Sequence, residues 1–387
     1  MKKNIFLLLF AFSISFASTV VIYNGFGFFE DMVTVNKTAT VVVPRTILPD
    51  SFYSDVEAKL TFVPAKNISL ESILSTNKFI YLNHKKYEVI SSKPLILKFG
   101  SDYIYNPDIK GFSFSSIPLR ENPKFVIESS FKKLRYSYLF KGISYELKYI
   151  FDDGRITSFL EIKNDTDYDF KDDTVYITTQ KIKESKHFNS DRLLLKSASQ
   201  EYSPEKSGEN YLYKIGKLDL PADSYFKVPF ISDKVKYTTY YKYYPTPSLS
   251  ELKTVISFKT SKLFPSGEWI VSEKNKDVVL FSSPVNLGNF SKQENVEIEY
   301  GPSYDLKGME TILKSVRNGK AYYKTFKDTI YNHKDKSVTV KIYKNARNAI
   351  LQNYDGKYER IGDFLVFILQ IAPNSGGDIS YTLKYSY

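Results

Sequence analysis

The residues from Gly142 to Thr179 constrain the fold more than any other part of the chain, because three short runs alternate apolar and polar side chains between turn-forming clusters. In the first run every second residue is apolar or aromatic: Tyr145, Leu147, Tyr149 and Phe151. This two-residue period is typical of a strand with one buried face. Gly154 follows in the turn Asp152–Arg155, where it takes a positive φ without steric cost, so we expect the chain to reverse there.

The next two runs continue the alternation. The inward positions are Ile156, Leu160 and Ile162 in the second run, and Val175 and Ile177 in the third. The chain also contains 32 Tyr and 29 Phe beside a single Trp, and aromatic rings pack well on pleated sheet surfaces. We therefore predict an all-β fold, with tandem immunoglobulin-like β-sandwich modules preceded by a small N-terminal β module.

The length of 387 residues suggests about two to four domains. We predict a signal peptide at 1–17, an N-terminal β module with a small barrel-like segment at 18–123, an immunoglobulin-like β-sandwich at 124–247 and a C-terminal β-sandwich at 248–387. Pro245 and Pro247 mark the last boundary, since proline is excluded from helix interiors and central strands. No internal sequence repeat is evident.

Two local predictions concern the first and last modules. Ser69–Ser75 has the pattern of a short helix, with Ser69 as N-cap and Glu71 in the first turn. The C-terminal module is expected to contain eight short strands: Leu252–Lys259, Trp269–Val271, Val278–Ser282, Val296–Tyr300, Tyr322–Tyr331, Ser337–Tyr343, Phe364–Ile371 and Ile379–Tyr385.

The first residues resemble a targeting signal. Lys2 and Lys3 precede an apolar run from Ile5 to Phe16, and small residues before and at Ala17 predict cleavage after Ala17. The run is too short to cross about 30 Å of hydrocarbon, and no later stretch reaches the roughly 20 apolar residues that a spanning helix needs. We expect an exported protein, periplasmic or extracellular, with no transmembrane segment in the mature chain. Retention of the leader as an anchor is the alternative.

The chain has no cysteine, which excludes disulfides, thiolate metal sites and a thiol nucleophile. Its formal charge of +11 becomes +9 when Lys2 and Lys3 leave with the leader. A basic surface suits nucleic acid, anionic lipid or acidic polysaccharide, and export argues against nucleic acid. A lysine-rich solvated surface without any ligand is the competing interpretation.

Alternate aspartates in the segment Asn164–Asp173 imitate the start of a calcium loop. Asp165, Asp167 and Asp169 have the spacing, but Phe170 replaces the sharp-turn glycine and Tyr176 stands where a bidentate glutamate would close the shell. We favour a polar hairpin loop. A calcium site would need help from Asp172 and Asp173 and remains an open alternative.

Catalytic and cofactor signatures are missing from the sequence. The three histidines, His84, His187 and His333, stand far apart, and neither a HExxH, a GxSxG nor a phosphate-binding glycine loop occurs. We therefore expect no cofactor and no metal. A pair of carboxylates from distant strands, as in glycosidases, leaves no local trace and stays open.

The run Lys234–Tyr244 interleaves lysines with tyrosines. Aromatic platforms beside cations suit sugar rings, so five residues are candidate ligand contacts: Lys236, Tyr237, Tyr241, Lys242 and Tyr243. The alternative is an ordinary strand with one buried face and its hydroxyl groups at the rim.

Several motifs together resemble the bacterial exported β-sandwich family called domain of unknown function 4139. They are VVIYNGFGFFED, VVVPRTILPDSFYSDV, SLESIL, YIYNP, the stretch Gly142–Ile177, LPADSYFKVPFI, KLFPSGEWIVSEKN and YNHKDKSVTVKIYK. The resemblance implies exported, immunoglobulin-like tandem modules and no catalytic residues. A long helical insertion found in some members has no counterpart here.

These observations lead us to expect an exported envelope protein that binds or scaffolds and is not an enzyme. Its expected partner is a cell-wall polysaccharide or another envelope protein. A hydrolase with dispersed carboxylates is the main alternative, and calcium-stabilised adhesion is a third.

Overall fold

The computed structural model describes residues 18–65, 69–82, 85–108, 110–114, 121–180, 204–207, 210–275 and 278–386. The predicted signal peptide, His84 and His187 lie outside these residues. Strands make up most of the described chain, so the predicted all-β class is confirmed. The helices within it are α1 (Leu70–Thr76) and the one-turn η1 (Pro49–Ser51), and neither has the length and apolar character needed to cross a membrane.

The chain divides into two compact units. Unit 1 is formed within Met1–Tyr145 and Lys163–Tyr225, and unit 2 within Glu146–Ile162 and Phe226–Tyr387. These units differ from the three predicted modules because strands from different modules pair with each other. In unit 1 the first strand pairs with residues 174–177, and in unit 2 the residues before Pro245 pair with those after it.

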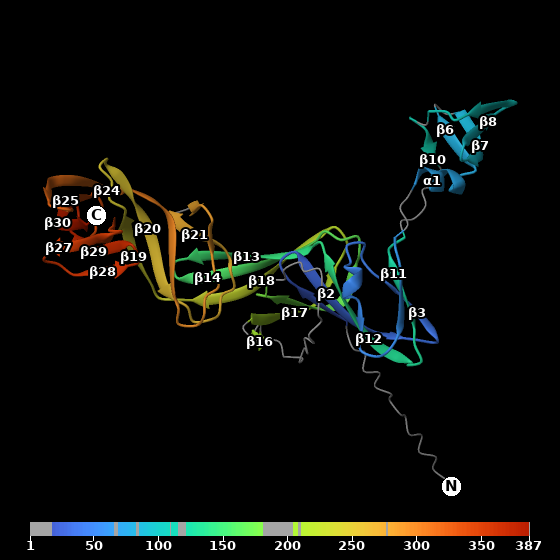
Figure 1. Ribbon diagram of the computed structural model, residues 1–387, viewed down its shortest axis with the longest axis horizontal. Coiled ribbons are helices and arrows are strands. Elements are labelled where there is room, and N and C mark those ends of the chain that lie inside the picture. Colours follow the sequence, from blue (N-terminus) through green and yellow to red (C-terminus); the bar gives the residue numbers. More distant parts are fainter. Residues whose placement is uncertain are drawn as a thin grey trace, which may run out of the picture. The chain divides into compact units, whose positions relative to one another are not determined.

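Unit 1 contains three sheets, and several of their strands are labelled in Figure 1. The seven-stranded sheet has the order β16 (Glu205–Ser207), β17 (Asn210–Leu220), β15 (Phe170–Thr178), β1 (Thr19–Ile22), β2 (Phe26–Thr34), β12 (Lys133–Lys141) and β4 (Tyr53–Ser54). The three-stranded sheet has the order β3 (Thr38–Val42), β11 (Lys124–Glu128) and β5 (Lys59–Val63). The five-stranded sheet has the order β10 (Ser113–Phe114), β6 (Phe79–Leu82), β7 (Lys85–Ser92), β8 (Leu95–Phe99) and β9 (Asp102–Tyr105).

Aromatic rings join the first two of these sheets. The ring of Phe52, just after η1, stacks on Phe125 of β11 at 3.9 Å and on Tyr136 of β12 at 5.7 Å between centroids. Alternate residues of β12 are buried as the two-residue period requires. The five-stranded sheet has a separate small core in which Leu74 of α1 packs with Ile80. The predicted helix is confirmed, since the Ser69 side chain accepts a hydrogen bond from the Ser72 N–H.

The predicted central hairpin is also confirmed. It forms β13 (Ile143–Asp152) and β14 (Arg155–Asn164), in which the inward residues Leu147, Tyr149, Phe151, Ile156, Leu160 and Ile162 are buried, and Tyr145 is partly buried. Asp153 and Gly154 have φ angles of +47° and +78° at the turn, as a type I′ hairpin requires. Val175 and Ile177 of β15 are buried as expected.

Unit 2 holds most of a six-stranded sheet and all of a nine-stranded sheet. The six-stranded sheet has the order β18 (Ser224–Lys234), β14, β13, β21 (Gly267–Asn275) and β22 (Val278–Phe281), with β23 (Val285–Leu287) also paired to β21. Its core surrounds Trp269, whose ring stacks on Tyr149 at 4.4 Å and contacts Phe258 of the nine-stranded sheet at 5.9 Å.

The nine-stranded sheet folds back on itself. Its order is β27 (Ala349–Asn353), β30 (Ser375–Ser386), β25 (Ala321–Asn332), β24 (Asn295–Asn318), β20 (Ser250–Lys259), β19 (Tyr237–Tyr243), β26 (Val338–Asn345), β29 (Phe364–Ile371) and β28 (Tyr358–Ile361). Phe367 of β29 stacks on Tyr381 of β30 at 4.7 Å although five strands separate them in the order. One curled sheet therefore encloses the core that two sheets enclose in a sandwich. The eight predicted C-terminal strands all exist, but β24 is far longer than expected, and β23, β27 and β28 were not foreseen.

Residues 19–234 and residues 237–386 repeat one strand pattern that the sequence did not reveal. In what we call the first repeat, β1 pairs in parallel with β15 and antiparallel with β2, and β15 pairs antiparallel with β17. In the second repeat, β19 pairs in parallel with β26 and antiparallel with β20, and β26 pairs antiparallel with β29. A hairpin and a final strand complete each repeat: β13, β14 and β18 in the first, and β24, β25 and β30 in the second.

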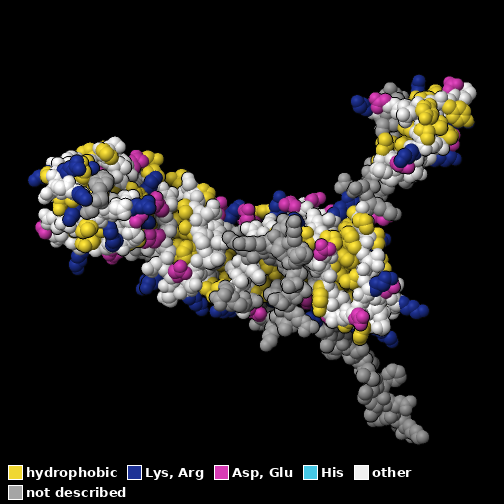
Figure 2. Space-filling model, in the orientation of Figure 1, with side chains coloured by type: hydrophobic (Ala, Val, Ile, Leu, Met, Phe, Trp, Pro, Cys, Tyr) yellow, Lys and Arg dark blue, Asp and Glu magenta, His cyan; other side chains and the backbone are white. Residues whose placement is uncertain are grey.

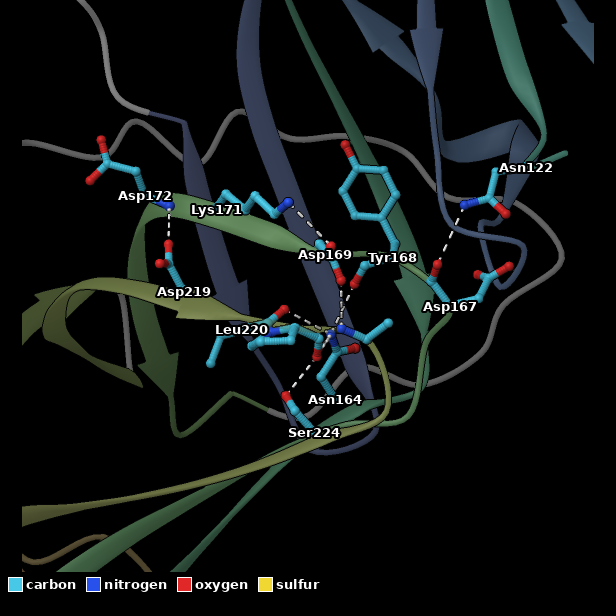
Figure 3. A network of polar contacts seen from close by, with 12 residues as sticks. Asn122, Asn164, Asp167, Tyr168, Asp169, Lys171, Asp172, Asp219, Leu220 and Ser224 are labelled. Carbon is cyan, nitrogen blue, oxygen red and sulfur yellow. Dashed lines mark hydrogen bonds and ion pairs between the residues drawn. The ribbon is translucent and has the colours of Figure 1, made fainter. Parts of the chain in front are cut away.

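An identical asparagine corner occurs in both repeats. In the first, Asn164 ends β14, accepts the Thr166 N–H, and donates through Nδ2 to the carbonyl oxygens of Tyr168, Leu220 and Pro221 (Figure 3). In the second, Asn332 ends β25, accepts the Lys334 N–H, and donates to the carbonyl oxygens of Lys336, Ile371 and Ala372. Two positions after the last acceptor carbonyl of each corner, Asp223 and Asn374 both have positive φ angles, +50° and +49°. The repeat is therefore structural, with few shared residue types.

Candidate functional site

Strand β19 carries four of the five predicted ligand contacts, and the structure separates them. Tyr241 and Tyr243 are 6% and 1% exposed and belong to the core of the nine-stranded sheet. Tyr237 is partly exposed, packs its ring edge-on against Phe151 and donates its hydroxyl to Asp153 at 2.7 Å. Lys236, just before the strand, is exposed. Because alternate residues of a strand face opposite ways, Tyr241 and Tyr243 cannot share a platform with Lys242.

Lys242 lies on the opposite face of the sheet from Tyr243. Its backbone pairs with Lys341 of the parallel strand β26. Side chains from four strands gather there, and we call them the outer-face cluster: Tyr240, Lys242, Tyr244, Glu297, Lys341, Tyr343 and Phe364. The cluster lies wholly within unit 2.

Glu297 binds both lysines of the cluster. Lys242 Nζ lies 3.0 Å from one carboxylate oxygen, and Lys341 Nζ lies 3.9 Å from the other. Burial alone lowers the pKa of Lys242, but the hydrogen bond and charge of Glu297 outweigh it and raise the pKa above its ordinary value. Burial likewise acts to raise the pKa of Glu297, and the Lys242 hydrogen bond brings the net pKa below the ordinary range. Lys242 and Glu297 are therefore charged at neutral pH.

Aromatic rings surround these charges. Lys341 Nζ lies 4.0 Å from the centroid of Tyr240, and Lys242 Nζ lies 5.4 Å from that of Tyr343. Tyr343 in turn contacts Tyr244 at 5.5 Å and Phe364 at 6.2 Å between centroids. Tyr240 is buried beneath its neighbours, and this burial raises the pKa of its hydroxyl. Tyr244 is 42% exposed, so it is the ring most open to a ligand.

Sequence reasoning found Lys242 but not its partners. Lys341, Tyr343 and Phe364 come from β26 and β29, about a hundred residues further along the chain. Only the parallel pairing of β19 with β26 brings them together. The sequence does contain one local signal: Lys341 and Tyr343 alternate with the buried Val340 and Ile342. This alternation predicts that the two residues face outward, but it does not predict which strand lies beside them.

The aspartates of the calcium-like loop bind separate partners. Asp165 pairs with Lys163 at 2.9 Å, Asp167 with Arg45 at 3.0 Å, and Asp169 with Lys171 at 3.3 Å. Figure 3 shows Asp167, Asp169 and Asp172 directed to different neighbours. The Ala222 N–H and Lys171 lower the pKa of Asp169. The arrangement is that of a polar loop framed by the asparagine corner. The predicted hairpin is wrong, because β14 and β15 on either side of the loop belong to different sheets.

Within the described part of the chain, no cluster of three or more His, Asp or Glu side chains is suited to bind a metal ion. Asp172 forms an ion pair with Lys217, whose Nζ lies 3.0 Å from the carboxylate, and Asp173 accepts a hydrogen bond from the Ser18 hydroxyl. His333 is exposed.

One carboxylate pair from separate strands bears on the hydrolase alternative. Glu310 of β24 and Asp328 of β25 are cross-strand partners, and the Tyr381 hydroxyl lies 3.2 Å from the first carboxylate and 2.9 Å from the second. Lys344 pairs with Glu310. Burial raises the pKa of Asp328 to about 7, and its Oδ1 has no hydrogen-bond partner among the described residues. Asp328 is 0% exposed, so a substrate has no access to it in this conformation.

Comparison with known proteins adds no relative: no family model matches the chain, and no curated protein matches it. The resemblance to domain of unknown function 4139 therefore stays a prediction from sequence motifs.

Proposed function

We propose that this chain is an exported envelope protein that binds cell-wall polysaccharide at the outer-face cluster and performs no catalysis. The observation that carries the proposal is the meeting of four aromatic rings with two lysines and one glutamate on one outward sheet face. Ring faces take up the apolar faces of sugars, and charged hydrogen-bonding groups beside them orient hydroxyl and carboxylate groups.

The charge of the chain supports an acidic polymer. Its net charge is +11, and on the face drawn in Figure 2 Lys and Arg side chains are spread over the part that contains the nine-stranded sheet. A positive surface raises the local concentration of polyanions and speeds their binding. Acidic cell-wall polymers are therefore the first ligands to test, with peptidoglycan beside them.

The location and family are part of the same proposal. Export rests on the apolar leader after Lys2 and Lys3, and the absence of cysteine makes the fold independent of the redox state outside the cytoplasm. The sandwich-like units support an immunoglobulin-like topology and membership of the family called domain of unknown function 4139, which we retain as proposals.

A retention assay tests the proposed site. The purified protein is passed over peptidoglycan and acidic polysaccharide at low salt, together with the double variant Tyr244→Ala/Lys341→Ala. We expect the protein to be retained and the variant to lose about tenfold in affinity, about 1.4 kcal/mol, since it removes the most exposed ring of the cluster and one of its two cations.

A matched variant separates this site from a general effect. Tyr304 is 74% exposed and Lys357 is exposed, so Tyr304→Ala/Lys357→Ala removes the same two residue types elsewhere in unit 2. Its binding is expected to equal that of the unmodified protein. Absence of retention on every polymer, or equal losses in both variants, would contradict the proposal.

A further inference from the structure

The far end of the β24–β25 hairpin extends beyond β20 on the β24 side, while β30 pairs with β25 as far as Ala321. β20 pairs with β24 only as far as Gly308, whereas β24 continues to Asn318 and pairs there with β25. All ten residues from Thr311 to Lys320 are exposed. Gly319 closes the hairpin with a φ of +59°. We call residues 311–326 the hairpin tip.

The hairpin tip is basic and contains no acidic residue. Its cations are Lys314, Arg317, Lys320 and Lys324. No acidic side chain of the described chain forms an ion pair with any of the four, in contrast to Lys242 and Lys344 in the same sheet. Four neighbouring positive charges without counterions repel one another and are stabilised by an anionic surface.

The same tip exposes aliphatic side chains. Ile312, Leu313 and Val316 are 53%, 55% and 42% exposed. An acidic polysaccharide neutralises the cations but leaves these side chains in water. A bilayer interface does both, because aliphatic groups enter the acyl boundary while lysine and arginine reach lipid phosphates. Tyrosine, present as Tyr322 and Tyr323, is enriched at that depth.

The corresponding hairpin of the first repeat shows what is different here. The turn at Gly154 is covered by the segment between β18 and β19. The Val235 N–H donates to the Gly154 carbonyl, and the Tyr237 hydroxyl donates to Asp153. No described segment forms such contacts with the turn of the hairpin tip, although β30 pairs with its β25 side. A register shift between Ile312 and Lys314, together with the lysines, disfavours addition of another strand at this edge.

We propose that the hairpin tip docks the protein on bilayers that contain anionic phospholipid. The inference goes beyond polysaccharide binding and uses a separate part of the nine-stranded sheet. Each basic residue near an anionic membrane surface strengthens binding by about fivefold, and the two adjacent aliphatic residues Ile312 and Leu313 add on the order of tenfold by entering the interface.

Vesicle sedimentation tests the proposal with the purified protein. We expect binding to phosphatidylcholine vesicles that contain phosphatidylglycerol, and little binding to vesicles of phosphatidylcholine alone. Lys314→Glu/Arg317→Glu/Lys320→Glu should weaken the binding by about a hundredfold or more, and raised salt should weaken it in the unmodified protein. Ile312→Ser/Leu313→Ser should weaken it by about tenfold with little change of Tm, since both side chains are already in water.

Matched variants make each outcome decisive. Lys259, Lys292 and Lys357 are exposed, so their triple change to Glu alters the net charge equally but spares the tip. Leu249 and Ile361, 54% and 51% exposed, provide the corresponding Ser control for the aliphatic pair. Equal losses in the tip and control variants would overturn the proposal. So would binding that ignores phosphatidylglycerol, or tip variants that lose only polysaccharide retention and bind vesicles unchanged.

Discussion

The two repeats share the asparagine corner, but at the equivalent buried position beside it one repeat has an apolar side chain and the other an acidic one. Asn164 and Asn332 are each 1% exposed and make the same set of hydrogen bonds. Four residues before each asparagine the side chain is 0% exposed in both repeats, yet it is Leu160 in the first and Asp328 in the second. The hydrogen bonds of the corner therefore specify the topology, and the core residues remain free to vary.

A second difference lies in the strand that starts each repeat. β1 reads TVVI and is buried along most of its length, whereas β19 alternates core tyrosines with Tyr240 and Lys242 of the outer-face cluster. The same position in the pattern is thus buried in one repeat and contributes to the outer-face cluster, the proposed ligand site, in the other. Function is expected where the second repeat departs from the first.

The largest expected effect comes from removing the shared corner. Asn164→Ala or Asn332→Ala leaves three carbonyl oxygens and one N–H of a buried corner without their partner, and each such group costs about 1–3 kcal/mol. We expect each change to lower the free energy of unfolding by about 4 kcal/mol or more, measured by urea denaturation. A loss in only one of the two variants would show that the corners are not equivalent.

The buried acid should make the second repeat sensitive to pH. Burial raises the pKa of Asp328 to about 7 from 3.8, so between these values the folded state holds a proton that the unfolded state releases. The free energy of unfolding should therefore fall as pH rises from about 4 to about 7, by up to about 4 kcal/mol. Asp328→Asn should flatten this dependence, and an unchanged slope in the variant would disprove the assignment.

The continuous strand β24 tests how tightly the second repeat is packed. A Cβ added at Gly308 would lie 2.6 Å from the ring of Tyr243 and 2.8 Å from the Ile330 side chain. Gly308→Ala should therefore lower the free energy of unfolding by about 1–3 kcal/mol through overpacking. Gly301 lies on the same strand with nothing within 4 Å of its Cβ, so Gly301→Ala is the matched control. Equal effects of the two changes would contradict close packing at Gly308.

The smallest effect is expected on the outward face. Lys242→Ala removes the ion pair with Glu297, in which the lysine side chain is 13% and the glutamate side chain 38% exposed, so the free energy of unfolding should fall by about 1 kcal/mol. Polysaccharide retention should decline more clearly than stability. A stability loss as large as that of the asparagine variants would assign Lys242 to the structure and not to a ligand.

Short-range patterns predicted much of the fold. Alternation located β13, β14 and β15 with their buried faces, the Asp-Gly turn located their hairpin, and Ser69 located the start of α1. Each of these depends on residues within about ten positions, where periodicity and turn chemistry act.

The features that the sequence did not predict depend on contacts between residues far apart in the chain. The pairing of β1 with β15 and of β19 with β26 decides the units and brings Lys341 beside Lys242, and parallel strands leave no local mark. The repeat escaped notice because the corner requires one asparagine and backbone groups only. Tyr241 and Tyr243 were expected at a ligand because a tyrosine strand looks alike whether its rings face a core or solvent.

The place of β1 within its sheet sets the order in which unit 1 can be completed. This strand follows the predicted leader directly, yet it lies between β2 and β15, about 150 residues further along the chain. During synthesis the strand has only β2 to pair with until Phe170–Thr178 has emerged. Such a long-range contact slows folding. The seven-stranded sheet can therefore close only after most of unit 1 has been synthesised.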